Sequence, residues 1–134
     1  MGETRGTRRE GVREAQDWFA FTARRLVAAE FGVAESELAR ASRCAAPTAF
    51  ARQVAMYMAH CAYQLSYGEV ARAFRRERTT VAHACAVVED ARDDPALEAR
   101  LDKVEGRMRD LARLVQGRPT AARSRTPGIA LPRL

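Results

Sequence analysis

The residues best suited to chemistry lie between positions 68 and 90, in the stretch GEVARAFRRERTTVAHACAVVED. Two apolar segments are separated there by an arginine cluster and a pair of threonines. Guanidinium groups bind phosphates and form paired hydrogen bonds with guanine, and threonine methyl groups pack on thymine. Where such residues begin a helix, they predict a contact with duplex DNA.

The second apolar segment meets the physical requirements of a helix that enters a major groove. Such a helix needs an apolar face that holds it on its scaffold and small residues on the opposite face. The scaffold face would consist of Val81, Ala84, Cys85 and Val88, and the small residues of Thr79, Ala82 and Ala86. With the short apolar segment before it, this segment predicts a helix-turn-helix over about residues 67–92.

The first turn of this second helix holds the candidate base-contacting residues, Glu77, Arg78, Thr79 and Thr80. Arg78 can bind guanine, and the threonine methyls can contact thymine. Glu77 has two interpretations, because it can accept a cytosine amine or hold an arginine in position. Arg72, Arg75 and Arg76 lie alongside and are expected to contact phosphates, which fixes register without reading sequence.

The overall charge agrees with a polyanionic partner. The chain has 134 residues, and its formal net charge is +6. A basic surface attracts nucleic acid or anionic lipid, and charge alone does not choose between them. No apolar run approaches the length of a membrane span, and the first ten residues lack the apolar core of a signal peptide. We therefore expect a cytoplasmic, nucleoid-associated protein with no membrane partner.

Other chemistries have little support in the sequence. Cys44, Cys61 and Cys85 are widely spaced and lie in apolar helical context, so they are expected to be reduced packing residues. Close ligand pairs such as C-x-x-C are absent, as is the phosphate loop G-x-x-x-x-G-K-[ST]. No nucleophile constellation or pair of carboxylates has a plausible catalytic spacing. We expect no metal, no cofactor and no enzymatic activity.

Apolar periodicity predicts a single all-α domain over residues 12–116, a six-helix bundle. The tails, residues 1–11 and 117–134, are expected to be basic and disordered. Ser66 with Glu69 forms a capping box, and Thr79 is expected to cap the fifth helix. The helices are expected over residues 12–31, 35–40, 49–65, 67–74, 79–92 and 95–116.

Trp18 and Phe21 lie off the apolar stripe of the first helix. They could cover a second face of the core, which is the favoured interpretation, or they could form an exposed contact for another subunit. The oligomeric state therefore stays open at this point.

Between Arg52 and Arg92 the sequence resembles the C-terminal DNA-binding domain (domain IV) of the bacterial replication initiator DnaA. That family typically reads RQ-x-AMYL, then LS-x-x-EIG-x-x-F, then RDHTTVLHA. The counterparts here are RQVAMYM from Arg52, LSYGEVARAF from Leu65 and RERTTVAHA from Arg76. The resemblance implies a Trp-repressor-like helix-turn-helix that binds duplex DNA in the major groove, with an additional arginine in the minor groove.

The resemblance also assigns roles to individual residues. Arg78 and Thr79 occupy base-reading positions, while Thr80 and Arg76 fall where phosphate or neighbouring contacts are expected. His83 matches a family histidine whose expected role is to brace the helix by a hydrogen bond, with DNA contact as the alternative. The complete set of expected phosphate contacts is Arg52, Ser66, Arg72, Arg75, Arg76 and His83.

Three departures from the family pattern predict an altered DNA preference. Glu77 and Arg78 stand where the family has aspartate and histidine. The turn after Phe74 is one residue shorter, with Arg75 in place of a glycine. Phe50 stands at the position of the minor-groove arginine and could not make that electrostatic contact, and Thr48 and Phe50 mark a candidate minor-groove region.

The function expected from these features is a sequence-specific transcription regulator that reuses the DnaA C-terminal fold without an ATPase domain. A phage-derived gene cluster, such as a gene transfer agent, is one candidate target. The first alternative is a replication modulator that competes with the initiator for its sites. The second is an interaction module in which Trp18, Phe21 and the tails bind RNA polymerase or another regulator.

Overall fold

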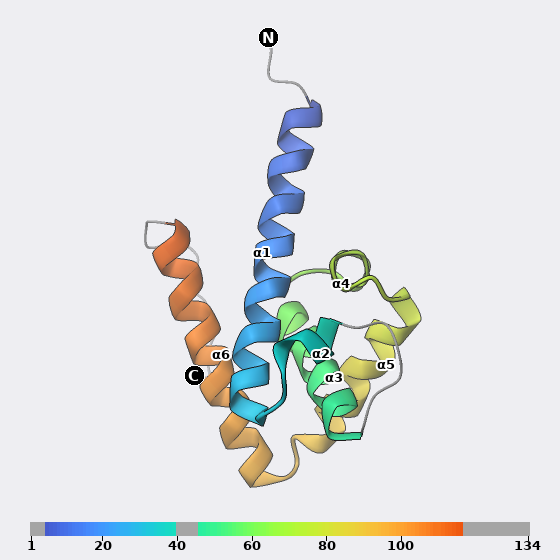
Figure 1. Ribbon diagram of the computed structural model, residues 1–134, viewed down its shortest axis with the longest axis vertical. Helices are drawn as coiled ribbons and strands as arrows, with labels where there is room; N and C mark the ends of the chain where they lie inside the picture. The colour runs from blue at the N-terminus through green and yellow to red at the C-terminus, as the bar shows by residue number, and fades with distance from the viewer. Residues whose placement is uncertain (1–4, 40–45, 117–134) are drawn as a thin grey trace.

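The computed structural model describes residues 5–39 and 46–116, and within these ranges every regular element is an α-helix. The predicted all-α fold with six helices is confirmed (Figure 1). The helices are α1 (Arg5–Phe31), α2 (Glu35–Ala39), α3 (Ala46–Cys61), α4 (Tyr67–Phe74), α5 (Arg78–Ala91) and α6 (Pro95–Gln116).

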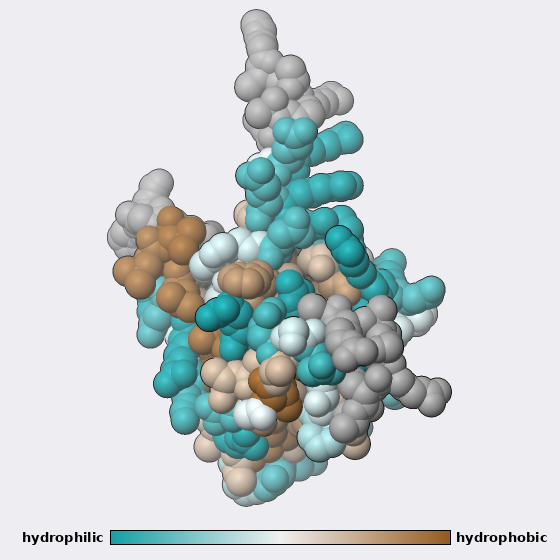
Figure 2. Space-filling view, viewed as in Figure 1, coloured by the Kyte–Doolittle hydropathy of each residue, from teal (hydrophilic) through white to brown (hydrophobic). Residues whose placement is uncertain are grey.

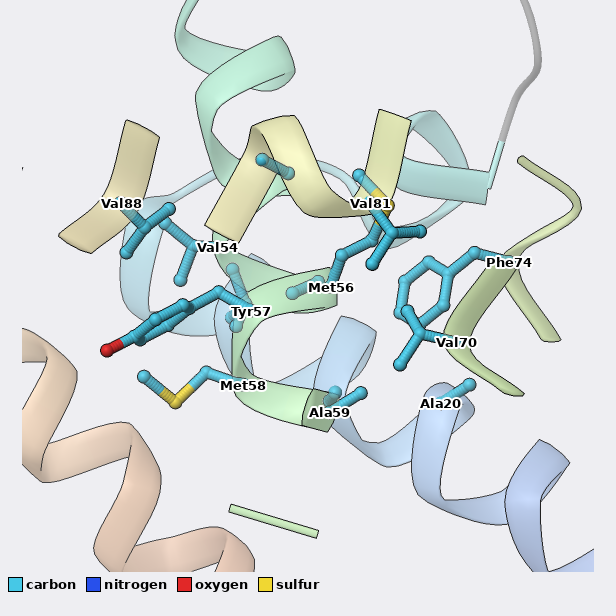
Figure 3. Close-up of a cluster of buried hydrophobic side chains, with 14 of the residues drawn as sticks. Ala20, Val54, Met56, Tyr57, Met58, Ala59, Val70, Phe74, Val81 and Val88 are labelled. Atoms are coloured by element: carbon cyan, nitrogen blue, oxygen red, sulfur yellow. The ribbon is translucent and has the colours of Figure 1, made fainter. Parts of the chain in front are cut away.

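Helix α3 is the centre of the bundle. Every residue from Val54 to Ala59 is buried, so this helix is enclosed on all sides, as expected for a helix that is apolar around its circumference. It packs against α1 and α5, and α4 packs against α5 (Figure 1). Figure 3 shows Val81 and Val88 of α5 in the same cluster as Met56 and Tyr57 of α3. The core therefore holds the second helix of the helix-turn-helix by its apolar face.

Helix α1 begins seven residues earlier than expected. It starts at Arg5 rather than Val12, so part of the segment expected to be a disordered tail is helical. Arginine and glutamate favour helices, and the two glycines of this segment, Gly6 and Gly11, each cost only about 1 kcal/mol relative to alanine. This N-terminal half projects beyond the other helices (Figure 1), and Val12 is 50% exposed. The expected C-terminal tail, residues 117–134, lies outside the described residues.

The predicted capping box at the start of α4 is confirmed. The hydroxyl of Ser66 accepts a hydrogen bond from the Glu69 N–H at 3.1 Å, and Glu69 Oε1 accepts one from the Ser66 N–H at 2.8 Å. Both bonds satisfy amide groups that the helix itself leaves unpaired. The capping box thus fixes where α4 begins after α3.

A polar network holds the C-terminal end of α5. Arg92 donates two hydrogen bonds to the carboxylate of Glu98 and one to the hydroxyl of Tyr57. The Tyr57 hydroxyl in turn donates to Glu89 Oε2 at 2.8 Å, and Asp102 accepts a further bond from Arg92 at 3.1 Å. Since paired guanidinium–carboxylate bonds are directional, the network fixes the orientation of α5 relative to α3 and α6.

An ion pair between α1 and α6 makes stability depend on pH. Lys103 Nζ and Arg100 Nε each lie 3.3 Å from the carboxylate of Glu30. Burial by itself raises the pKa of Glu30, but hydrogen bonds from Lys103 and Arg100 outweigh it, so the pKa lies below its usual value of 4.5. A depressed pKa in the folded state means that the ionised carboxylate stabilises the fold above pH 4.5, and that this stabilisation is lost as the pH falls through the lower folded value.

We therefore predict that Glu30→Gln lowers the free energy of unfolding at pH 7 and has a smaller effect at pH 3. Urea denaturation of the wild type and the variant at both pH values measures the difference. An equal loss at the two pH values would show that the charge of Glu30 does not contribute.

Candidate nucleic-acid interface

The turn between α4 and α5 consists of three residues, Arg75, Arg76 and Glu77, where about four were expected. Arg75 adopts the left-handed conformation, with φ 58° and ψ 49°. Its N–H donates to the carbonyl of Arg72 at 3.3 Å, and the Arg76 N–H donates to that of Ala71 at 2.9 Å. These two bonds form a Schellman motif, whose left-handed position is usually occupied by glycine. Arg75 therefore stands where the family is expected to have a glycine, in a backbone conformation that is strained for an arginine.

We predict that Arg75→Gly raises the free energy of unfolding by up to about 1 kcal/mol, because it removes left-handed strain while giving the unfolded chain more freedom. The same substitution is expected to weaken DNA binding, since it removes an exposed guanidinium beside α5. Arg75→Asn is the matched variant, because asparagine tolerates the left-handed region but has no charge. Urea denaturation and DNA titration of both variants test the prediction, and lower stability of the glycine variant would contradict it.

The start of α5 differs from the sequence prediction in a way that favours DNA contact. The N-cap residue is Glu77, in extended conformation, and it makes no side-chain capping bond. The prediction that Thr79 caps this helix was wrong, because the extended Glu77 lets the helix begin at Arg78 and places Thr79 in the first turn. The N–H groups of this turn have no side-chain cap and can bind a phosphate.

The structure brings the predicted base-contacting residues together on one exposed surface. Glu77, Arg78, Thr79 and Thr80 are all exposed, whereas Val81 is completely buried. The opposite face of α5 is anchored in the core by Val81, Ala84, Cys85 and Val88. The helix therefore presents its polar first turn to solvent on a fixed scaffold, and the individual base contacts stay predictions.

The predicted phosphate-contacting residues lie in different environments. Arg75 is exposed, Arg76 is half-buried, and Ser66 is exposed at the beginning of α4. The Ser66 oxygen accepts the capping bond, and its O–H can still donate to a phosphate. Arg72 donates to Gln16 Oε1 at 3.0 Å and to Asp17 Oδ1 at 3.2 Å, so its guanidinium is held against α1.

Arg52 belongs to the scaffold rather than to an exposed surface. Its Nε donates to the carbonyl of Leu38 at 3.1 Å, and its Nη2 donates to that of Glu37 at 2.9 Å. These carbonyls lie in the last turn of α2, where arginine side chains commonly satisfy unpaired oxygens. The predicted phosphate contact of Arg52 would therefore compete with its attachment to α2.

His83 and the predicted minor-groove region also differ from the expectations. His83 is exposed and makes no hydrogen bond within the part of the chain that the structure describes, so the expected bracing role has no support. Its ring is free to reach DNA. Phe50 is half-buried, and its ring centroid lies 6.1 Å from that of Phe31. Thr48 beside it is half-buried, so this region packs on α1 in the free protein.

The two aromatic residues whose roles were left open, Trp18 and Phe21, lie in different environments. Trp18 is half-buried, with its ring centroid 5.4 Å from Phe19 and 6.2 Å from Tyr63. Trp18 therefore packs on two aromatic rings that border the core, those of Phe19 and Tyr63. Phe21 is 44% exposed, and the guanidinium of Arg25 lies over its ring at 5.5 Å.

The described residues contain neither an activated cysteine nor a cluster of metal ligands. Burial raises the pKa of the Cys85 thiol to about 12, and burial also raises that of Cys61. Both thiols are free and stay protonated at neutral pH, while Cys44 lies outside the described residues. Residues 5–39 and 46–116 contain no cluster of three His, Cys, Asp or Glu side chains that could hold a metal ion. No helix in these ranges combines the length and apolar character needed to cross a membrane.

The short α4, the Schellman turn and the anchored α5 with a polar first turn define a helix-turn-helix of the kind that binds DNA. Residues 23–88 match the family model described as the bacterial dnaA protein helix-turn-helix. Residues 23–88 therefore form a DnaA C-terminal-like helix-turn-helix domain, as the sequence indicated. No curated protein matches the sequence.

Proposed function

We propose that the protein is a sequence-specific binder of double-stranded DNA that regulates transcription. One observation carries the proposal: the four residues at the start of α5 are exposed together, while the opposite face of this helix is buried. In a DnaA-type helix-turn-helix this surface would enter the major groove. The protein would act in the cytoplasm, associated with the nucleoid.

The recognised sequence is proposed to differ from the usual box of the initiator. Arg78 can form a paired bond to guanine, which the family histidine at this position cannot. Phe50 is packed on Phe31 and carries no charge for a minor groove. Each altered base contact changes discrimination by about 1–3 kcal/mol, which is enough to redirect binding.

A transcription regulator and a competitor of the initiator would occupy different sites on a genome. Genome-wide footprinting distinguishes them, because a regulator occupies a small set of promoters, such as those of a phage-derived gene cluster. Occupancy confined to the replication origin would overturn the regulator and favour the replication modulator. Gel shifts that compare the initiator's box with random duplex give a second readout. Equal affinity for these two duplexes would support a recognised sequence that differs from the box.

A partner-protein role has one supporting observation, the exposed ring of Phe21 on α1. RNA polymerase or a second regulator would be the partner. Loss of regulation by Phe21→Ala, with unchanged DNA affinity, would assign that role to this surface in addition to DNA binding.

A further inference from the structure

A groove lies between the N-terminal half of α1 and the beginning of α4. It has a volume of about 500 Å³ and is lined by Arg9 and Arg13 of α1, by Ser66 and Gly68 at the start of α4, and by Arg72. The first amides of α4 belong to this end of the helix, where the helix dipole favours negative charge. Figure 2 shows hydrophilic side chains along the projecting half of α1.

A second hollow shares Arg72 with the first. It has a volume of about 340 Å³ and is lined by Arg24 of α1, by Arg72 of α4 and by Arg75 in the turn, with Asp17 as its carboxylate. Arg72 lines both hollows, which both lie against α1 and α4, and we refer to the two together as the α1–α4 trough. This α1–α4 trough contains five arginines and two carboxylates, Asp17 and Glu69.

The carboxylates of the trough are already engaged, whereas several of its cations are not. Asp17 accepts a bond from Arg72, and Glu69 accepts the capping bond from Ser66. Within the described residues, Arg9 and Arg13 are exposed and make no ion pair or hydrogen bond. A trough with unpaired guanidinium groups is suited to bind phosphates.

Arg24 adds an unsatisfied donor at the second hollow. Its Nε is buried and makes no hydrogen bond, although it forms an ion pair with Glu35 Oε2 at 3.7 Å, a distance too long for a hydrogen bond. A buried donor without an acceptor is costly, and an oxyanion in the hollow would relieve that cost. The guanidinium also lies over the ring of Phe74 at 5.1 Å, which holds it at the hollow.

We propose that the α1–α4 trough binds the sugar-phosphate backbone beside the site that α5 reads. The inference rests on the proposed function. Helix α4 packs against α1 on one side and α5 on the other, so a duplex on α5 passes next to the trough (Figure 1). Arg9 and Arg13 lie before residue 23, outside the family match, whereas Arg24, Arg72 and Arg75 of the trough lie within it.

Phosphate contacts have a measurable signature in salt dependence. Each contact contributes about 0.9 to the slope of log affinity against log salt. Removal of a contact weakens binding to all DNA sequences alike. We expect Arg9→Gln with Arg13→Gln to reduce this slope by about 2, both for a duplex that the wild type selects from a random pool (the selected duplex) and for random duplex. Arg13→Gln alone is expected to reduce it by about 1. Glutamine keeps helix propensity nearly unchanged, so α1 should stay folded.

The test is fluorescence anisotropy with both duplexes between 50 and 200 mM NaCl. Arg107→Gln is the matched control, because this exposed residue lies on α6, on the other side of α1 from α4 (Figure 1), and its removal should leave the slope within about 0.5 of the wild type. An unchanged slope in the Arg9 and Arg13 variant, with Arg78→Ala still relaxing specificity, would overturn the trough alone. If the wild type binds neither duplex, the proposed function and this inference both fail.

Discussion

Arg78→Ala is expected to weaken binding to the preferred duplex by about 5- to 150-fold, equivalent to about 1–3 kcal/mol, and to leave binding to random duplex little changed. The reason is the position of Arg78 in the exposed first turn of α5, where a paired bond to guanine would read one base pair. The loss should therefore appear as relaxed discrimination at a single base position.

Two controls separate base reading from charge. Arg78→Lys keeps the charge but loses the paired geometry, so we expect it to lose discrimination while it keeps part of the affinity. Arg107→Gln removes an exposed charge on α6, on the other side of α1 from α4 (Figure 1), and should change neither the affinity nor the discrimination. Anisotropy titrations with the selected duplex and single-base variants of it measure these differences. A uniform loss on every sequence would show that Arg78 is a phosphate contact.

Phe74→Ala is expected to lower the free energy of unfolding by about 3–5 kcal/mol. Phe74 is 7% exposed and ends α4, where its ring shares a cluster with Val70 and Val81 (Figure 3). Its removal would leave a cavity between α4 and α5 and would also deprive Arg24 of its aromatic contact. Since this packing fixes the angle of the helix-turn-helix, DNA affinity should fall even under conditions where the variant is folded.

Phe21→Ala is the matched control for stability, because Phe21 is 44% exposed on α1. Its truncation should cost much less, about 1 kcal/mol or below. Urea denaturation of both variants measures the difference. Equal costs would mean that Phe74 does not stabilise the junction of α4 and α5.

Local signals explain why much of the fold could be predicted from sequence. The capping box of Ser66 and Glu69 places the start of α4, and Pro95 after Asp94 places the start of α6. Both signals depend on residues within one turn of each other. The start of α1 was missed because glycines and a lack of apolar periodicity suggested a tail, whereas the helix begins at Arg5 in a segment that also holds helix-favouring arginines and a glutamate.

Residue types at the turn located the candidate site, but not the partners of its arginines. The exposed first turn of α5 follows from the apolar spacing of this helix. The attachment of Arg52 to α2 and of Arg72 to Gln16 depends on residues 14 to 56 positions away. No local pattern encodes such pairs, and the same holds for the bonds between Arg92 and Tyr57.

The groove along α1 also required three-dimensional information. Arg9 and Arg13 are four residues apart, a spacing that places them on one face of a helix. That signal could be used only if the segment was known to be helical. Their position beside Ser66 becomes evident only when α1 and α4 are packed together.

The central claim, that the first turn of α5 reads a DNA sequence, is tested most directly by selection of bound duplexes from a random pool at physiological salt. We predict that the wild type enriches one short motif that differs from the initiator's usual box, and that Arg78→Ala loses preference at one position of it. Recovery of an unenriched pool, or of the same motif from wild type and variant, would contradict the account.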